Sequence, residues 1–228
     1  MLLFTSSTIL PEIGCYPQIE RLNSDIPNFQ QVCSDLLNLN ERLNYEPKLS
    51  YTAAYKAKLT DLVKASQVLL ISEKLLKILL NSNVENSQYF KVDVIHRKKI
   101  HPYYLYFIYG QNYDLVDYQN MTFKGISVPP YSDFYRKPEE QEGVKKKVIK
   151  VETPSQLINW QKLYPDFPNR EYEALKLNFT NIHTDMIRLP FLVNGGYFVS
   201  EALKNKIVEA KCTGIDFRTK DWQEKPIL

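Results

Sequence analysis

A short apolar run that passes directly into a capped helix is the feature that most constrains the fold of this chain. Val68–Ile71 is an apolar run of strand length, and Ser72-Glu73 follows it. Serine is a favoured N-cap because its hydroxyl accepts a hydrogen bond from a free N–H of the first helical turn, and glutamate beside it complements the helix dipole. Residues 74–80 continue with helical spacing, and 90–95 begins with period-two alternation. The pattern predicts a strand, a Ser-capped helix and a second strand.

The same pattern recurs near the C-terminus. Residues 197–208 align with the first copy at a separation of 128 residues, which pairs Ser72 with Ser200. Residues 215–217 match 92–94 at a separation of 123. Duplication and independent convergence on good capping chemistry both account for the match. Either origin predicts the same local structure.

Other segments predict further helices and strands. Apolar residues at helical spacing predict a helix over 27–40. The aromatic and aliphatic run 103–109 predicts a strand, which we expect to form a hairpin with 113–118. Thr153 begins a capping box with Gln156, and this box opens a short helix.

Together these elements predict an α+β fold of two related halves. Each half contains a strand, a Ser-capped helix and a strand, within mixed or antiparallel sheets that have flanking helices. The predicted division of one compact domain is an N-terminal helical segment (1–60), a first half (61–124), a proline-rich loop (125–143) and a second half (144–228).

Composition excludes several classes of protein. Of 228 residues, 44% are hydrophobic and 24% are charged, which is typical of a soluble globular chain. The net charge of +3 is too small for a strongly electrostatic nucleic-acid binder, so we do not expect nucleic acid as the partner. No run approaches the ~20 apolar residues of a membrane-spanning helix, and no membrane association is expected. Only seven glycines are present, which disfavours a Gly-rich phosphate loop.

The chemistry-bearing residues form no recognisable catalytic or metal-binding pattern. Three separated cysteines and three histidines without zinc spacing predict no metal and no cofactor. Asp117, Asp185 and Asp216 are not spaced as an acid–base pair, and capping explains Ser200. We therefore predict no catalytic residues and a protein that is not an enzyme. The alternative, an enzyme with an unrecognised site, requires a pocket that joins one of these aspartates or a histidine.

Aromatic side chains in the proline-rich loop are the candidates for partner binding. Tyrosine offers a large contact area and few torsions to order, and loops often bind partners. The candidates are Tyr131, Phe134, Tyr135 and Arg136. Packing within the loop is the alternative role for the three rings. The basic runs 96–99 and 145–147 are typical of a solvated face or a lysine-guarded edge strand.

Three groups of residues resemble the C-terminal half of a bacterial immunity-protein family of polymorphic toxin systems, long described as a domain of unknown function. They are Asp185–Leu189, Tyr197–Leu203 and Thr213–Phe217. The N-terminal half of that family is similar to Leu70–Glu73, Phe90–Val94 and Leu115–Tyr118. The resemblance spans roughly residues 65–218, and residues 1–60 have no match.

This resemblance implies a cytoplasmic protein that binds and neutralises a cognate toxin made by the same bacterium. Because the matching positions are caps and core, no catalytic residue is implied, and we expect neutralisation by occlusion of the toxin. The alternative is a nucleic-acid-associated protein that uses the basic, tyrosine-rich region 91–150 to meet phosphates and stack bases. The sequence does not give the toxin, the binding face or the oligomeric state.

Overall fold

The structure is a computed structural model, and it describes most of the chain in segments. These are residues 1–23, 32, 36, 41–65, 68–110, 122–127, 145–153, 155–156, 159–166, 169–174, 183–189 and 196–218. The chain divides into two compact units, Met1–Asn112 with His183–Lys220, and Tyr113–Ile182 with Asp221–Leu228. Strands predominate over short helices in mixed and antiparallel sheets, so the predicted α+β class is confirmed.

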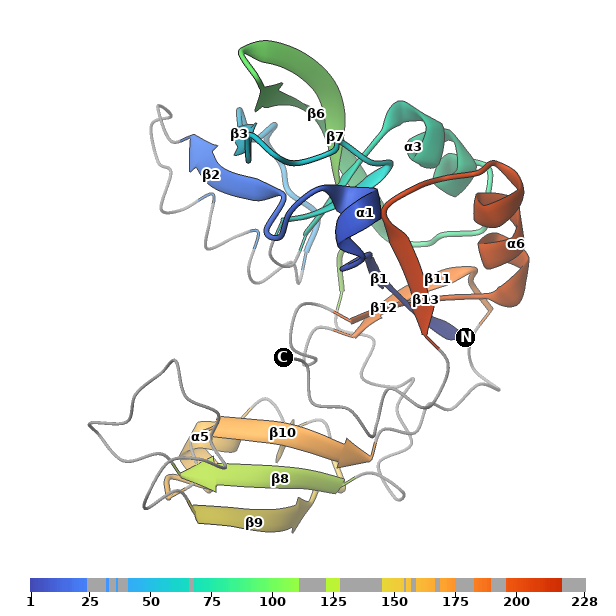
Figure 1. The fold of residues 1–228 in the computed structure, drawn as a ribbon. Helices are drawn as coiled ribbons and strands as arrows, with labels where there is room; N and C mark the ends of the chain where they lie inside the picture. Colours follow the sequence, from blue (N-terminus) through green and yellow to red (C-terminus); the bar gives the residue numbers. More distant parts are fainter. Residues whose placement is uncertain are drawn as a thin grey trace. The chain divides into compact units, whose positions relative to one another are not determined.

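Unit 1 contains both copies of the capped strand–helix pattern (Figure 1). Its elements before the insertion of unit 2 are β1 (Leu2–Ser6), α1 (Leu10–Ile13), β2 (Ile19–Asn23), β3 (Ser50–Ala53), β4 (Leu62–Ala65), β5 (Val68–Ile71), α3 (Glu73–Leu80), β6 (Ser87–His96) and β7 (Lys99–Ile108). Its later elements are β11 (Met186–Leu189), β12 (Gly196–Val199), α6 (Glu201–Glu209) and β13 (Ile215–Arg218).

Two sheets build unit 1. The six-stranded sheet has the order β2-β3-β6-β7-β5-β4 and is mixed because β3 and β6 are parallel. The four-stranded sheet has the order β11-β12-β1-β13 and is antiparallel. The series β4-β5-β7-β6 matches β11-β12-β1-β13 strand for strand, with every neighbouring pair antiparallel. The N-terminal strand β1 therefore occupies in the second copy the place that β7 occupies in the first.

Strand register fixes how the two copies align. Tyr106 of β7 lies opposite Tyr89, and Phe4, at the equivalent place in β1, lies opposite Phe217. Tyr89 and Phe217 are separated by the same 128 residues as Ser72 and Ser200. The predicted separation of 123 for this strand is wrong, because β6 begins at Ser87 and β13 at Ile215, so the loops after the two helices keep the longer spacing.

A core shared by both copies holds unit 1 together. Phe4 from β1 and Tyr197 from β12 belong to the same buried cluster as Leu69, Leu75 and Tyr106 from the first copy. Full burial of one large apolar side chain contributes about 1.5–3 kcal/mol. A second cluster, on the other face of the six-stranded sheet, is formed by alternate residues of the same strands. The two copies therefore pack as one body.

Several sequence predictions for unit 1 need correction or lie outside the described residues. The segment 1–60, predicted as helical, contains β1, β2 and β3. The predicted helix over 27–40 lies outside the described residues except for Val32 and Leu36, which are helical and buried. The partner predicted for 103–109, residues 113–118, also lies outside them. In the described part, β7 pairs with β6 and β5.

Unit 2 contains a three-stranded antiparallel sheet with β8 at its centre. Its elements are β8 (Thr122–Ser127), β9 (Lys145–Lys150), α5 (Trp160–Leu163) and β10 (Asn169–Ala174). The ring of Phe123 packs against Trp160 with centroids 5.8 Å apart, and both side chains are buried. The predicted loop from residue 125 is wrong at its start, because Gly125 pairs with Lys147 of β9. Its remainder, 128–143, lies outside the described residues.

The division of the chain follows these contacts. Residues 144–182, assigned from sequence to the second half, belong to unit 2, and the second copy in unit 1 uses 186–218 with β1. In unit 2 the amide oxygen of Gln156 accepts hydrogen bonds from the backbone N–H groups of Thr153 and Glu152. The bond to Thr153 is the reciprocal half of a capping box.

Candidate functional site

The two cap serines each hydrogen-bond to an aspartate that precedes an edge strand. The Ser72 hydroxyl accepts from the N–H of Leu75 and donates to Asp61 Oδ1 at 2.6 Å. In the second copy, the Ser200 hydroxyl accepts from the N–H of Leu203 and donates to Asp185 Oδ1, also at 2.6 Å. Each hydroxyl is engaged both as donor and as acceptor. These serines are thus N-caps of α3 and α6, and their carboxylate partners hold them in place.

The second carboxylate oxygen of each aspartate links the two copies. Asp61 Oδ2 accepts from the N–H of Thr213, in the loop after α6, at 2.8 Å. Asp185 Oδ2 accepts from the N–H of Asn83, in the loop after α3, at 3.1 Å. Each copy therefore supplies the aspartate that ties down the helix end of the other. Gly214 is needed in the first of these loops, because φ is +76° and a Cβ would collide with Thr60.

The charges at these links are balanced. Burial raises the pKa of Asp61, but hydrogen bonds from Lys74, Ser72 and Thr213 outweigh it, so the net pKa lies below its ordinary value. The pKa of Lys74 is raised, chiefly by its hydrogen bond to Asp61, and the two groups lie 2.8 Å apart. Burial raises the pKa of the nearby Cys212 thiol. A protonated thiol is a poor nucleophile, so this arrangement is suited to holding structure.

A basic and aromatic end of the β6–β7 hairpin offers a different chemistry. We define the hairpin tip as Tyr55, Lys56, Arg97, Lys98, Lys99 and Ile100. The Arg97 guanidinium lies 5.2 Å from the centroid of the Tyr55 ring, and its Nε donates to the Tyr55 carbonyl at 3.1 Å. All six residues of the hairpin tip are exposed. In Figure 1 this end of the hairpin forms the uppermost part of unit 1.

The turn of this hairpin has an uncommon residue choice. His96 pairs with Lys99, so Arg97 and Lys98 alone form the turn, with φ of 49° and 63°. Two positive φ values in a two-residue loop define a type I′ turn, for which Asn-Gly is preferred. Left-handed conformation costs an ordinary residue roughly 1–2 kcal/mol. The chain thus places two cations where local stability favours neutral residues.

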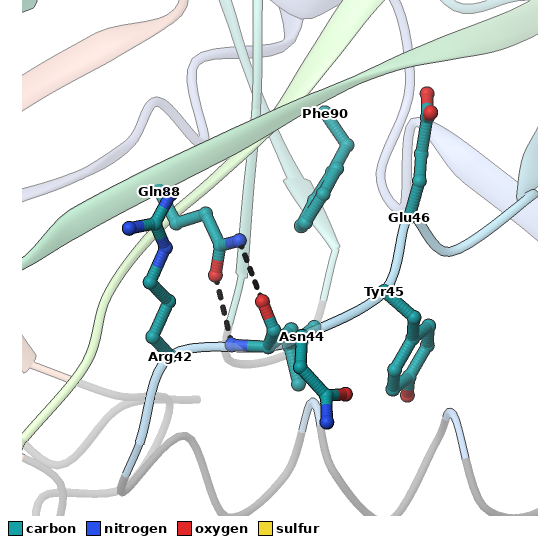
Figure 2. Close-up of a pocket in the computed structure, with 7 residues that line it drawn as sticks. Arg42, Asn44, Tyr45, Glu46, Gln88 and Phe90 are labelled. Atoms are coloured by element: carbon teal, nitrogen blue, oxygen red, sulfur yellow. Dashed lines mark hydrogen bonds between the residues drawn. The ribbon is translucent and has the colours of Figure 1, made fainter.

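A shallow pocket lies where residues 42–46 run beside β6 (Figure 2). It encloses about 480 Å³ and is lined by Arg42, Leu43, Asn44, Tyr45, Glu46, Gln88 and Phe90. The Gln88 amide accepts from the Leu43 N–H and donates to the Leu43 carbonyl, both at 2.9 Å, as the dashed lines in Figure 2 show. These bonds fasten the segment to the sheet. The lining contains one acid and one base but no histidine, cysteine or serine.

Metal and membrane chemistry were searched across the described residues. Within those segments, no three His, Cys, Asp or Glu side chains are grouped so that they could hold a metal ion. In the same part of the chain, no helix has the length and apolar character needed to cross a membrane.

The structure sorts the tyrosines by environment. Tyr103 and Tyr106 are buried; the Tyr103 hydroxyl donates to the Thr60 carbonyl at 2.7 Å, and burial raises the pKa of Tyr106 to about 12. Tyr16, Tyr55 and Tyr89 are exposed instead. Stacking of a ligand on the rings of β7 is therefore restricted, whereas Tyr55 is accessible.

The predicted partner-binding residues Tyr131, Phe134, Tyr135 and Arg136 lie outside the described residues, as does Asp117. Asp185 is used at its helix cap, and Asp216 accepts from Arg218 Nε at 2.8 Å. Sequence reasoning missed the contact of Tyr55 with Arg97, because 41 residues separate Tyr55 from its other neighbour His96 and no local pattern joins them. The turn itself lacks the Asn-Gly signal that would have predicted a hairpin.

Comparison with known proteins finds no matching protein-family model and no curated protein similar to this chain.

Proposed function

We propose that this protein is a non-catalytic immunity protein that binds and neutralises a cognate bacterial toxin domain by occlusion, in the cytoplasm of the producing cell. The observation that carries the proposal is where the family-like residues lie. Ser72, Ser200, Asp185 and Thr213 all take part in the two reciprocal links between the copies. The resemblance therefore concerns one folded unit and its organising contacts.

The use of the Ser–Asp pairs also supports a binding role. Hydrolysis by a serine nucleophile requires a base that can accept the hydroxyl proton and a free path to substrate. Here each hydroxyl is committed to a helix N-terminus and to a carboxylate that also binds the other copy. The exposed chemistry of unit 1 lies instead at the hairpin tip, whose tyrosine and arginine are residue types enriched at binding hot spots.

A toxicity-rescue experiment tests this proposal. The protein encoded by the gene adjacent to this one would be expressed in a bacterial host, with and without this chain, and growth and co-purification measured. We expect that the neighbour arrests growth, that this chain restores growth, and that the two proteins co-purify. A neighbour that is harmless, or whose toxicity persists in the presence of this chain without any complex, would contradict the proposal.

One observation favours a second candidate, a nucleic-acid-associated function. Arg97, Lys98 and Lys99 lie beside an accessible tyrosine ring, a combination that meets phosphates and stacks bases. A gel shift with a single-stranded DNA oligonucleotide, weakening as salt is raised, would support it. Absence of any shift at low salt would remove it.

A further inference from the structure

The hairpin tip is a concentrated positive surface. Residues 54–57 and 95–101 contain four lysines and arginines, two histidines and no acid. His96 lies between the tip and the sheet, with its ring 6.2 Å from that of His101 and its Nε2 3.3 Å from the Tyr55 carbonyl. No printed ion pair of the described residues involves Arg97, Lys98 or Lys99. The positive charge of the tip thus faces solvent.

Apolar groups are exposed on both faces of the hairpin behind this charge. Val94 and Tyr103 point into a core, so strand alternation places Ile100 and its cross-strand neighbour Ile95 on the opposite face. Ile100 is 66% exposed. On the other side, Tyr55 is 73% exposed and lies under Arg97. A convex end with an aliphatic contact on one face and an aromatic contact on the other is suited to insertion into a cleft.

We propose that the hairpin tip is the docking element of this protein and that it inserts into an acidic cleft of a protein partner. This inference rests on the proposed function, in which the partner is the toxin, and adds the surface and its chemistry. Charge complementarity argues for acidic side chains around the cleft, and the exposed isoleucine argues for protein rather than phosphate, which offers it no apolar contact. Neutralisation then follows from occupation of the cleft.

The turn residues support a binding role for the tip. Asn-Gly would form this type I′ turn with less strain than Arg97-Lys98. Strained backbone that persists without a stability benefit tends to occur at functional sites. The Arg97 side chain is in addition fixed by Tyr55 through the ring contact and the carbonyl bond. An arginine ordered before binding loses less conformational entropy on docking.

This choice of residues supplies a test in which binding and folding separate. The variant Arg97→Asn/Lys98→Gly removes two charges and installs the preferred turn pair, so it is expected to unfold at the wild-type temperature or above. The matched control is Lys145→Gln/Lys147→Gln, which removes two exposed charges from β9 in unit 2. Affinity for the purified neighbour-gene protein would be measured by calorimetry, and the same proteins would be titrated with a single-stranded DNA oligonucleotide.

We expect the turn variant to bind the neighbour-gene protein at least about tenfold more weakly and the β9 control to bind like wild type. Equal binding by wild type and the turn variant would overturn the docking assignment while leaving the immunity proposal intact. Equal weakening in both variants would also overturn it, because the effect would then be one of total charge. Tighter binding to the oligonucleotide than to the protein would assign the tip to nucleic acid. Absence of any complex with wild type would contradict the proposed function itself, and the docking assignment with it.

Discussion

At the scale of single residues, Asp61 and Asp185 join local capping to long-range structure. Asp61 bonds to Ser72 eleven positions away in its own copy and to Thr213, 152 positions away, in the other. A hydrogen bond to a charged group contributes about 1.5–3 kcal/mol, whereas the loss of a serine cap costs about 1 kcal/mol. The aspartates are therefore expected to matter more than the caps they hold.

Asp61→Ala is expected to lower the free energy of unfolding by about 2–3 kcal/mol, because it removes the partner of Ser72, Thr213 and Lys74 together. Ser72→Ala, the matched change on the other side of one bond, is expected to cost about 1 kcal/mol. Urea denaturation of both single variants and of the double variant measures their coupling. Strict additivity of the two losses would contradict the shared link.

The same carboxylate predicts how stability depends on pH. The pKa of Asp61 in the folded protein lies below the ordinary value of 3.8, so its ionised form stabilises the fold. This contribution is complete above the unfolded pKa and is lost as the pH falls through the folded pKa. Asp61→Asn does not titrate at this position, so its stability deficit relative to wild type is expected to shrink below about pH 4. A deficit that stays constant with pH in urea denaturation would contradict this.

At the scale of elements, the β6–β7 turn gives neighbouring lysines opposite roles. Lys98 has φ of 63°, whereas Lys99 is the first residue of β7. Lys98→Gly is expected to raise the free energy of unfolding by about 0.5 kcal/mol, because relief of left-handed strain exceeds the added entropy of the unfolded chain. Lys99→Gly is expected to lower it by about 1 kcal/mol. Thermal denaturation distinguishes the pair, and an equal loss in both would refute this assignment of strain.

At the scale of the whole molecule, β1 completes a sheet whose other strands lie nearly 200 residues along the chain, as the pairing of Leu2 with Val199 shows. Phe4 is 2% exposed within the shared core. Phe4→Ala is expected to lower the free energy of unfolding by about 3–5 kcal/mol and to speed amide exchange in β5 as well as in β12. Leu3→Ala, on the opposite face of the same strand, is the control. Faster exchange confined to the four-stranded sheet would indicate that the two copies unfold separately.

The sequence by itself determined the local units of this protein. Val68–Ile71 followed by Ser72, and Tyr197–Val199 followed by Ser200, predict strand and capped helix because apolar runs and N-caps act within a few residues. It also indicated the α+β class, which sums such units. Only the tertiary structure placed β1 in the second copy, tied Asp61 to Thr213 and brought Tyr55 under Arg97. These choices depend on pairing, packing and hydrogen bonding between residues far apart in the chain, for which local periodicity has no signal.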